Sequence, residues 1–173
     1  DFLDKLKAQI ERYQFGDPMD VKNSGGPIAR LDLLNNLKRQ IEKAISNGGR
    51  ILYKNEKLFK KGYYFSPHII ENISRDCAYF EEFFGPVFLI FDFTNTEELI
   101  ELVNNNQYGL SASIWSENIN LAMDIAPKIK AGVIWINSTN LFDASCGFGG
   151  FKESGFGREG GSEGIRAYLK ISL

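Results

Sequence analysis

The fold is decided by residues 110–136, which read LSASIWSENINLAMDIAPKIKAGVIWI. The two ends of this stretch, 110–115 and 131–136, are apolar and β-prone, which favours a strand at each end. Between them, apolar residues recur every four positions, which predicts a helix over 118–129. Strand, helix and strand joined by short links are typical of a βαβ unit with parallel strands.

The same alternation extends toward the N-terminus. Residues 87–91 form a continuous apolar strand pattern, and Thr96 can cap a helix that reaches about Val103. Continuous apolar strands indicate a parallel sheet that is covered on both faces. We therefore expect an α/β protein with a three-layer parallel sheet, in a single domain that spans residues 1–173.

The N-terminal part of the chain also has regular patterns. They predict helices at 2–14 and 29–47, a short strand at 50–53 and an extended segment at 63–73. Residues 147–161 hold seven glycines, too many for the interior of a strand or helix. A short helix is expected after this glycine-rich loop, near residues 162–169.

Composition and charge narrow the function classes. The 22 acidic and 20 basic residues leave no basic excess, so a nucleic-acid partner is not expected. No apolar run approaches the ~20 residues that a membrane helix needs. No secretory signal is visible, so we expect no membrane partner and a cytoplasmic location. Two cysteines are too few for a disulfide scaffold, and the single histidine, His68, argues against a zinc site.

Two patterns carry weak functional signals. Residues 155–160 match G-x-G-x-x-G, but a dinucleotide fingerprint needs a preceding strand and an acidic residue about 20 positions later. A glycine-rich loop precedes this match, so we interpret it as part of that loop. Glu81 and Glu82 could form a paired-carboxylate site, although adjacent side chains rarely converge on one point.

The residues that follow Glu82 favour a different role. Residues 82–87, Glu-Phe-Phe-Gly-Pro-Val, place a carboxylate and an aromatic ring before a Gly-Pro turn and a buried strand. Ligands of open α/β sheets bind at such strand edges. A carboxylate there could accept hydrogen bonds from two ribose hydroxyls, and an aromatic ring could pack against a nicotinamide.

This string resembles the E-x-F-G-P-V motif of the NAD(P)-dependent aldehyde dehydrogenases. Other motifs similar to that family's occur in the family's order, at residues 15–18, 26–27, 62–67, 106–112, 132–137 and 148–159. The resemblance covers nearly the whole chain, which looks like the C-terminal part of the family's catalytic domain. The segment at 26–33 is similar to bacterial succinate-semialdehyde dehydrogenases, but the choice of aldehyde stays open.

The resemblance implies an oxidoreductase that converts an aldehyde to a carboxylic acid with NAD or NADP. In this family a cysteine thiolate attacks the aldehyde to give a thiohemiacetal, and hydride then leaves for the nicotinamide. A glutamate-activated water hydrolyses the resulting thioester. The resemblance also implies a homo-oligomer, a dimer or tetramer, for the full-length protein, with residues 171–173 at the start of an oligomerisation strand.

The resemblance also assigns ligand contacts. Glu82 would hold the nicotinamide ribose, and Phe84 would bound the nicotinamide. The aldehyde pocket would be lined by Leu141, Phe142 and Phe148. Asn137 and the glycine-rich loop would shape that pocket, because small residues permit a close backbone approach.

The family's nucleophilic cysteine, general-base glutamate and Rossmann cofactor domain belong upstream of the helix at 2–14. We therefore expect this chain to be a fragment that holds no catalytic residue and is inactive alone. Cys77 lies where the family has no nucleophile and Cys146 lies near the pocket, and neither is expected to act chemically. An incomplete sheet would leave an exposed edge and an apolar face.

Two other hypotheses stay open. The chain could be a non-catalytic, truncated relative of the same fold that serves as an assembly or interaction module. It could also be an independent nucleotide-binding α/β domain, which would then bind NAD by itself.

Overall fold

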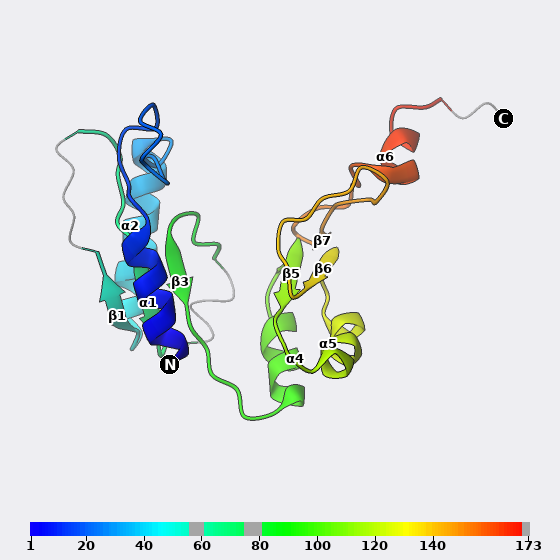
Figure 1. The fold of residues 1–173 in the computed structure, drawn as a ribbon, viewed down its shortest axis with the longest axis horizontal. Helices are drawn as coiled ribbons and strands as arrows, with labels where there is room; N and C mark the ends of the chain where they lie inside the picture. Colours follow the sequence, from blue (N-terminus) through cyan, green and yellow to red (C-terminus); the bar gives the residue numbers. More distant parts are fainter. Residues whose placement is uncertain (56–60, 75–80, 171–173) are drawn as a thin grey trace. The chain divides into compact units, whose positions relative to one another are not determined.

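The computed structural model describes residues 1–55, 61–74 and 81–170 (Figure 1). The chain forms two compact units, Asp1–Asp92 and Phe93–Leu173. The expected oligomerisation strand at 171–173 and the expectation for Cys77 lie outside the described residues.

Among its described residues, the first unit combines two helices with a three-stranded sheet. Its elements are α1 (Phe2–Arg12), α2 (Leu31–Ser46), β1 (Arg50–Lys54), β2 (His68–Glu71) and β3 (Val87–Leu89). The strand order is β1-β2-β3, with β1 antiparallel and β3 parallel to β2. In the parallel pair His68 stands opposite Val87, so β3 begins directly after the Gly-Pro turn at 85–86.

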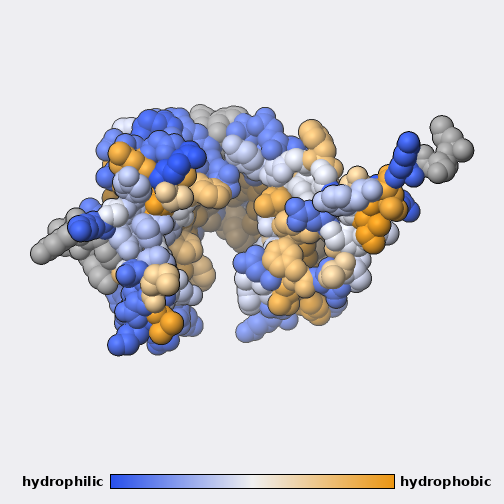
Figure 2. All heavy atoms as spheres, turned by 90° about the horizontal axis from the view of Figure 1, so that it is seen from above, coloured by the Kyte–Doolittle hydropathy of each residue, from blue (hydrophilic) through white to orange (hydrophobic). Residues whose placement is uncertain are grey.

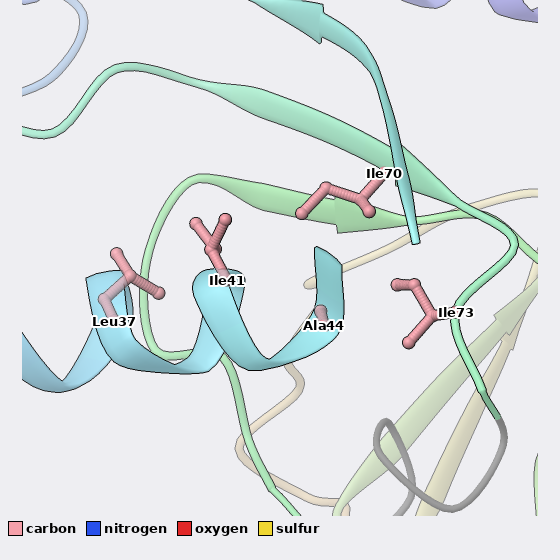
Figure 3. Close-up of a cluster of buried hydrophobic side chains, with 5 residues drawn as sticks. All are labelled: Leu37, Ile41, Ala44, Ile70 and Ile73. Carbon is pink, nitrogen blue, oxygen red and sulfur yellow. The ribbon is translucent and has the colours of Figure 1, made fainter. Parts of the chain in front are cut away.

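The core of this unit lies between α2 and β2. The spacing of apolar residues along α2 places Leu34, Leu37, Ile41 and Ala44 on one buried stripe. The central cluster consists of Leu37, Ile41, Ala44, Ile70 and Ile73 (Figure 3). Each large apolar side chain buried here contributes about 1.5–3 kcal/mol. The strand β3 joins the same core, because Val87 and Leu89 pack against this cluster.

In the part that the structure describes, the second unit contains two parallel strands that are connected along the chain by a helix. Its elements are α4 (Thr96–Asn104), β4 (Tyr108–Gly109), β5 (Ser111–Ile114), α5 (Ile119–Ile125), η1 (Ala126–Lys128), β6 (Val133–Ile136), β7 (Phe151–Lys152) and α6 (Gly161–Arg166). β5 and β6 are parallel, and Ser111 stands opposite Val133. β4 pairs antiparallel with β7, which ties the glycine-rich loop to the start of this unit.

The structure confirms the α/β class and the βαβ unit at 110–136. It differs from the sequence-based picture in how β3 pairs: this strand is bonded to β2, and the amide of Ile90 continues the ladder by donating to the carbonyl of Ile70 at 2.9 Å. The described strands therefore form separate small sheets. The prediction that Thr96 caps α4 is wrong, since Asn95 is the N-cap and its side chain accepts from the amide of Glu98.

Large apolar side chains are exposed in both units. Figure 2 shows hydrophobic side chains between hydrophilic ones on the face that it presents. Three residues that the resemblance assigns to ligand contacts belong to this exposed set: Phe84, Leu141 and Phe142, at 72%, 68% and 64%. Exposed apolar surface of this kind is typical of places where a ligand or another polypeptide binds.

Leu37 and Leu31 offer a test of this core, because both are leucines of α2 with opposite exposure. Leu37 is 1% exposed and Leu31 is 51% exposed. We expect Leu37→Ala to destabilise the protein by about 2–5 kcal/mol, since it leaves a cavity between α2 and β2. Leu31→Ala should cost less than ~1 kcal/mol. Thermal denaturation of both variants measures the difference, and equal losses would contradict the assigned core.

Candidate functional site

Residues 81–87, here called the motif loop, lead into β3 and are bonded to β2. The amide of His68 donates to the carbonyl of Pro86 at 3.0 Å, and the amide of Val87 donates to the carbonyl of Gly85 at 2.8 Å. The first bond ties the Gly-Pro turn to the start of β2, and the second closes the turn itself. The turn therefore has a fixed place at the edge of the parallel β2-β3 pair.

Side chains of the motif loop alternate between the interior and solvent. Glu81 and Phe83 are half-buried, whereas Glu82 and Phe84 are exposed. Phe83 packs against the core cluster, and Phe84 is 72% exposed. A period of two is the pattern of extended backbone, in which successive side chains point to opposite sides. Residues 82 and 84 thus share the outer side of the loop.

Gly85 lies close against α2. A Cβ atom at this position would lie 2.4 Å from Cδ2 of Leu37, a side chain that is almost fully buried and has little room to move. Any side chain would push the motif loop away from the helix. The glycine of the motif is therefore required by packing, and it sets the distance between the motif loop and α2.

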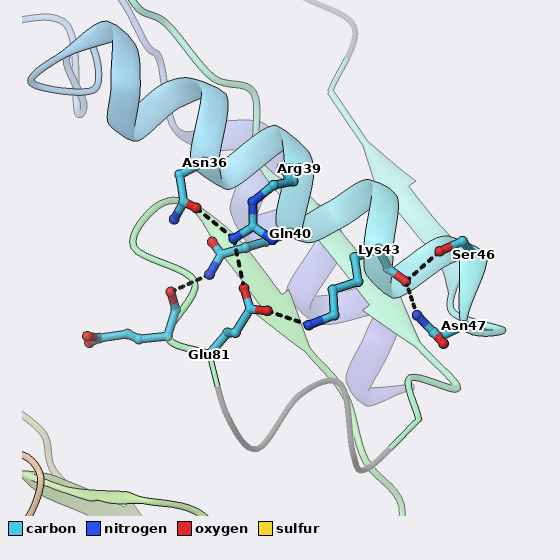
Figure 4. A network of polar contacts seen from close by, with 8 residues as sticks. Asn36, Arg39, Gln40, Lys43, Ser46, Asn47 and Glu81 are labelled. Atoms are coloured by element: carbon cyan, nitrogen blue, oxygen red, sulfur yellow. Dashed lines mark hydrogen bonds and ion pairs between the residues drawn. The ribbon is translucent and has the colours of Figure 1, made fainter.

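Besides this apolar contact, the motif loop makes polar contacts with α2, which Figure 4 shows. This polar face consists of Asn36, Arg39, Gln40 and Lys43. The carboxylate of Glu81 accepts from Lys43 Nζ at 2.5 Å and from Arg39 Nη2 at 3.2 Å. Gln40 Nε2 donates to the main-chain carbonyl of Glu82 at 3.0 Å. The hydrogen bond from Lys43 is the largest cause that lowers the pKa of Glu81 below its ordinary value, and the positive charges of Lys43 and Arg39 act in the same direction.

Glu81 and Glu82 therefore have different environments. The Glu81 side chain is 21% exposed and carries two ion pairs. The Glu82 side chain is exposed, and the described part of the chain gives its carboxylate no hydrogen bond or ion pair. A paired-carboxylate site does not form, because the two side chains lie on opposite sides of the loop. The outer carboxylate is available to a ligand that donates hydrogen bonds.

In the second unit, the three expected pocket residues form one aromatic cluster with Trp135. The rings of Trp135 and Phe142 lie edge to face at 5.7 Å, and those of Phe142 and Phe148 at 5.0 Å. The indole Nε1 of Trp135 donates to the carbonyl of Leu141 at 2.9 Å. Trp135 is buried in β6, so it fixes Leu141 and Phe142 to a rigid strand.

The glycine-rich loop is held by its own polar residues. Lys152 Nζ donates to the carbonyls of Asn104 and Asn106 at 2.8 and 2.9 Å, at the C-terminal end of α4. Ser154 Oγ accepts from the amide of Gly109 at 3.0 Å. The backbones of Phe148 and Glu159 pair at 2.7 Å in both directions. The polar motif residues Lys152 and Ser154 thus anchor the glycine-rich loop that carries Phe148.

Local backbone geometry explains two further motif positions, Gly132 and Asn137. A Cβ atom on Gly132 would lie 1.6 Å from the carbonyl oxygen of Gly149, so only glycine fits at this position, directly before β6. Asn137 has a φ of +52°, which asparagine tolerates better than most residues. Its side-chain amide bonds both the amide and the carbonyl of Ser116, at 2.9 and 3.0 Å. Asn137 therefore joins the ends of β5 and β6.

The sequence alone did not identify the residues whose hydrogen bonds fix the motif loop and the glycine-rich loop: Arg39, Gln40, Lys43, Lys152 and Ser154. For α2 the sequence did contain a clue: Gln40 falls among the buried apolar positions of an amphipathic helix, and a buried glutamine needs a polar partner. For the glycine-rich loop the signal was weak, since Lys152 and Asn104 are 48 positions apart.

Neither of two cavities in the first unit contains the outer residues of the motif loop. One, of about 680 Å³, is lined by residues of α2, β1 and the segment 62–68. The other, of about 490 Å³, is lined by α1 residues together with Pro86 and Phe88. Within the described ranges no group of His, Cys, Asp or Glu is arranged to hold a metal ion. In the same ranges no helix is both long and apolar enough to cross a membrane.

Comparisons with known proteins agree with the motifs. The model of the aldehyde dehydrogenase family matches residues 1–173. A succinate semialdehyde dehydrogenase [NAD(P)+] of Escherichia coli (strain K12) is 36% identical over 98% of this chain. An aldehyde dehydrogenase of Enchytraeus buchholzi is 34% identical over 99% of it. A betaine aldehyde dehydrogenase of Staphylococcus aureus, solved in complex with NAD+, superposes with a TM-score of 0.91 at 31% identity over 98% of this chain.

The chain belongs to the aldehyde dehydrogenase family. It spans 37% and 35% of the lengths of the two relatives, and 35% of the Staphylococcus aureus structure.

Replacing Glu81 with Gln tests the ion pairs on its carboxylate. Because the folded-state pKa of Glu81 is lowered, its ionised form stabilises the fold above about pH 5, and this contribution is lost as pH falls through that pKa. We expect Glu81→Gln to cost at most about 1 kcal/mol at ~pH 7, because Arg39 and Lys43 are half-exposed. The melting temperatures of the two proteins should converge toward ~pH 4.

The control for this measurement is Glu42→Gln, which removes an exposed carboxylate from the same helix. Its effect should stay small at every pH. A Glu81→Gln effect that is as large at ~pH 4 as at ~pH 7 would contradict the ion pairs of Glu81 with Lys43 and Arg39.

Proposed function

We propose that the protein to which this chain belongs oxidises an aldehyde to a carboxylic acid with NAD or NADP. The observation that carries this proposal is the exposed pair on the motif loop, the carboxylate of Glu82 and the ring of Phe84. The relatives support it: one is named as an NAD(P)+-dependent succinate semialdehyde dehydrogenase, and a betaine aldehyde dehydrogenase was solved with NAD+.

The outer side of the motif loop fits a nicotinamide ribose. An ionised carboxylate offers two oxygens and accepts hydrogen bonds from two neighbouring hydroxyls. The ring of Phe84, two residues later on the same side, offers a flat apolar surface for the nicotinamide. When bound, the nicotinamide accepts the hydride. Glu82 and Phe84 would act by binding and orienting it.

The aromatic cluster of the second unit fits the aldehyde. Leu141, Phe142 and Phe148 offer apolar surface, and Trp135 fixes two of them through its indole hydrogen bond and its ring contact. Such a surface binds the carbon skeleton of an aldehyde and excludes water from it. The anchored glycine-rich loop holds Phe148 in this cluster through the Phe148–Glu159 backbone pair.

The chemical step is proposed to pass through a thiohemiacetal on a cysteine outside these 173 residues. In this proposal Cys77 and Cys146 have no chemical role, and the chain alone is inactive because it supplies binding contacts without nucleophile or general base. We also propose that both units belong to one catalytic domain, and that the whole protein is a dimer or tetramer of identical subunits.

Glu82→Gln in the whole protein tests the cofactor contact. The change removes the charge from the acceptor of the ribose hydroxyls, so we expect the Kd and KM for NAD(P)+ to rise on the order of 10-fold. The KM for the aldehyde should change little. Steady-state kinetics and equilibrium binding of NAD(P)+ measure both.

Glu101→Gln, which alters an exposed carboxylate of α4, is the matched control and should bind NAD(P)+ like the wild type. Unchanged affinity in Glu82→Gln would argue against the ribose contact. A wild-type protein that reduces no NAD(P)+ with any aldehyde would favour the non-catalytic assembly module instead.

Phe142→Ala tests the aldehyde contact, because Phe142 touches both Trp135 and Phe148. We expect the aldehyde kcat/KM to fall on the order of 10-fold through lost apolar contact. The Kd for NAD(P)+ should stay unchanged. Tyr168→Ala, which removes an aromatic ring that is 92% exposed, serves as the control. Equal effects of the two substitutions on the aldehyde would sink this assignment.

A further inference from the structure

The motif loop is fixed to α2 by two polar contacts on neighbouring residues. In the first, the carboxylate of Glu81 accepts hydrogen bonds from Lys43 and Arg39. In the second, the main-chain carbonyl of Glu82 accepts a hydrogen bond from Gln40. Both contacts lie on the inner side of the loop, and Figure 4 shows the side chains of Arg39, Gln40 and Lys43 pointing toward it. The polar face of α2 therefore fixes the backbone on each side of the Glu81–Glu82 peptide bond.

Fixing Glu81 inward fixes the direction of Glu82. The burial of residues 81–84 alternates, so a side chain held toward α2 at position 81 requires an outward side chain at position 82. A rotation of this segment that released Glu81 would also turn the Glu82 carboxylate away from solvent. The ion pairs of Glu81 thus act on the orientation of a neighbour that they do not touch.

Gln40 shows that this contact is built for orientation more than for stability. Its side chain is 4% exposed, and Nε2 is used on Glu82 while Oε1 has no hydrogen-bond partner within the described residues. An unsatisfied buried oxygen offsets most of the stability that one hydrogen bond provides. A methionine of similar volume would fill the site without this cost. What only the glutamine provides is a donor aimed at the Glu82 carbonyl.

We propose that Gln40, Lys43 and Arg39 are positioning residues of the cofactor site, which hold the Glu82 carboxylate and the Phe84 ring toward the nicotinamide ribose. This proposal rests on the proposed function, because it requires Glu82 to contact the cofactor. The three residues act through the motif loop and do not themselves touch a ligand. Their removal should weaken the binding of NAD(P)+ and leave the binding of the aldehyde unchanged.

The experiment compares Gln40→Met and Lys43→Met with the wild type in the whole protein. Equilibrium titration with NAD+ or NADP+ gives the Kd, thermal denaturation gives the melting temperature, and steady-state kinetics give the two KM values. Gln40→Met should weaken NAD(P)+ binding on the order of 2- to 10-fold while its melting temperature stays equal or rises. Lys43→Met should weaken binding in the same direction, and Lys43→Arg, which keeps the charge, should restore it.

Lys38→Met is the control, since Lys38 is an exposed lysine of α2 outside the polar face. It should change neither affinity nor melting temperature. If Glu82→Gln weakens NAD(P)+ binding while Gln40→Met and Lys43→Met bind like the wild type, the positioning role is overturned and the proposed function stands. If Glu82→Gln also binds like the wild type, both fail. A Gln40→Met variant that loses affinity only in proportion to lost melting temperature shows a merely structural role and also overturns the proposal.

Discussion

The first unit depends on the packing of α2 against β2 and the motif loop. Leu37 is at the centre of this contact, because it belongs to the core cluster with Ile70 and also lies where Gly85 approaches the helix. The same helix presents its polar face to Glu81 and to the carbonyl of Glu82. One helix thus supplies both the apolar contact that forms the core and the polar contacts that orient the candidate cofactor residues.

Much of this arrangement could be predicted from local sequence. The βαβ unit at 110–136 follows from apolar periodicity, and the helix at 31–46 follows from its amphipathic stripe. The pairing of β3 with β2 could not, because a continuous apolar strand fits any parallel neighbour and its partner is set by tertiary packing. The cap at Asn95 was missed by one position, since asparagine and threonine both cap helices.

In the candidate site, too, some residues could be predicted from the sequence and others could not. Glu82, Phe84 and the expected pocket residues are predicted from motif spacing, because that spacing is local and can be found in a single sequence; their roles stay predictions. The residues behind them could not, because their partners are distant in sequence: Gln40 bonds a residue 42 positions away, and Lys152 reaches back 48 positions. A buried glutamine and a lysine in a glycine-rich loop signal that a partner exists, but only the fold identifies it.

In the proposed cofactor site, the motif loop presents Glu82 and Phe84 to a nicotinamide ribose while the polar face of α2 holds the loop in place. A crystal structure of the whole protein with NAD(P)+ bound tests it most directly. We expect the Glu82 carboxylate oxygens to lie within about 2.6–3.2 Å of the nicotinamide ribose hydroxyls. We also expect Gln40 Nε2 to donate to the Glu82 carbonyl in that structure. A ribose held by other residues, with the Glu82 carboxylate turned toward α2, would contradict it.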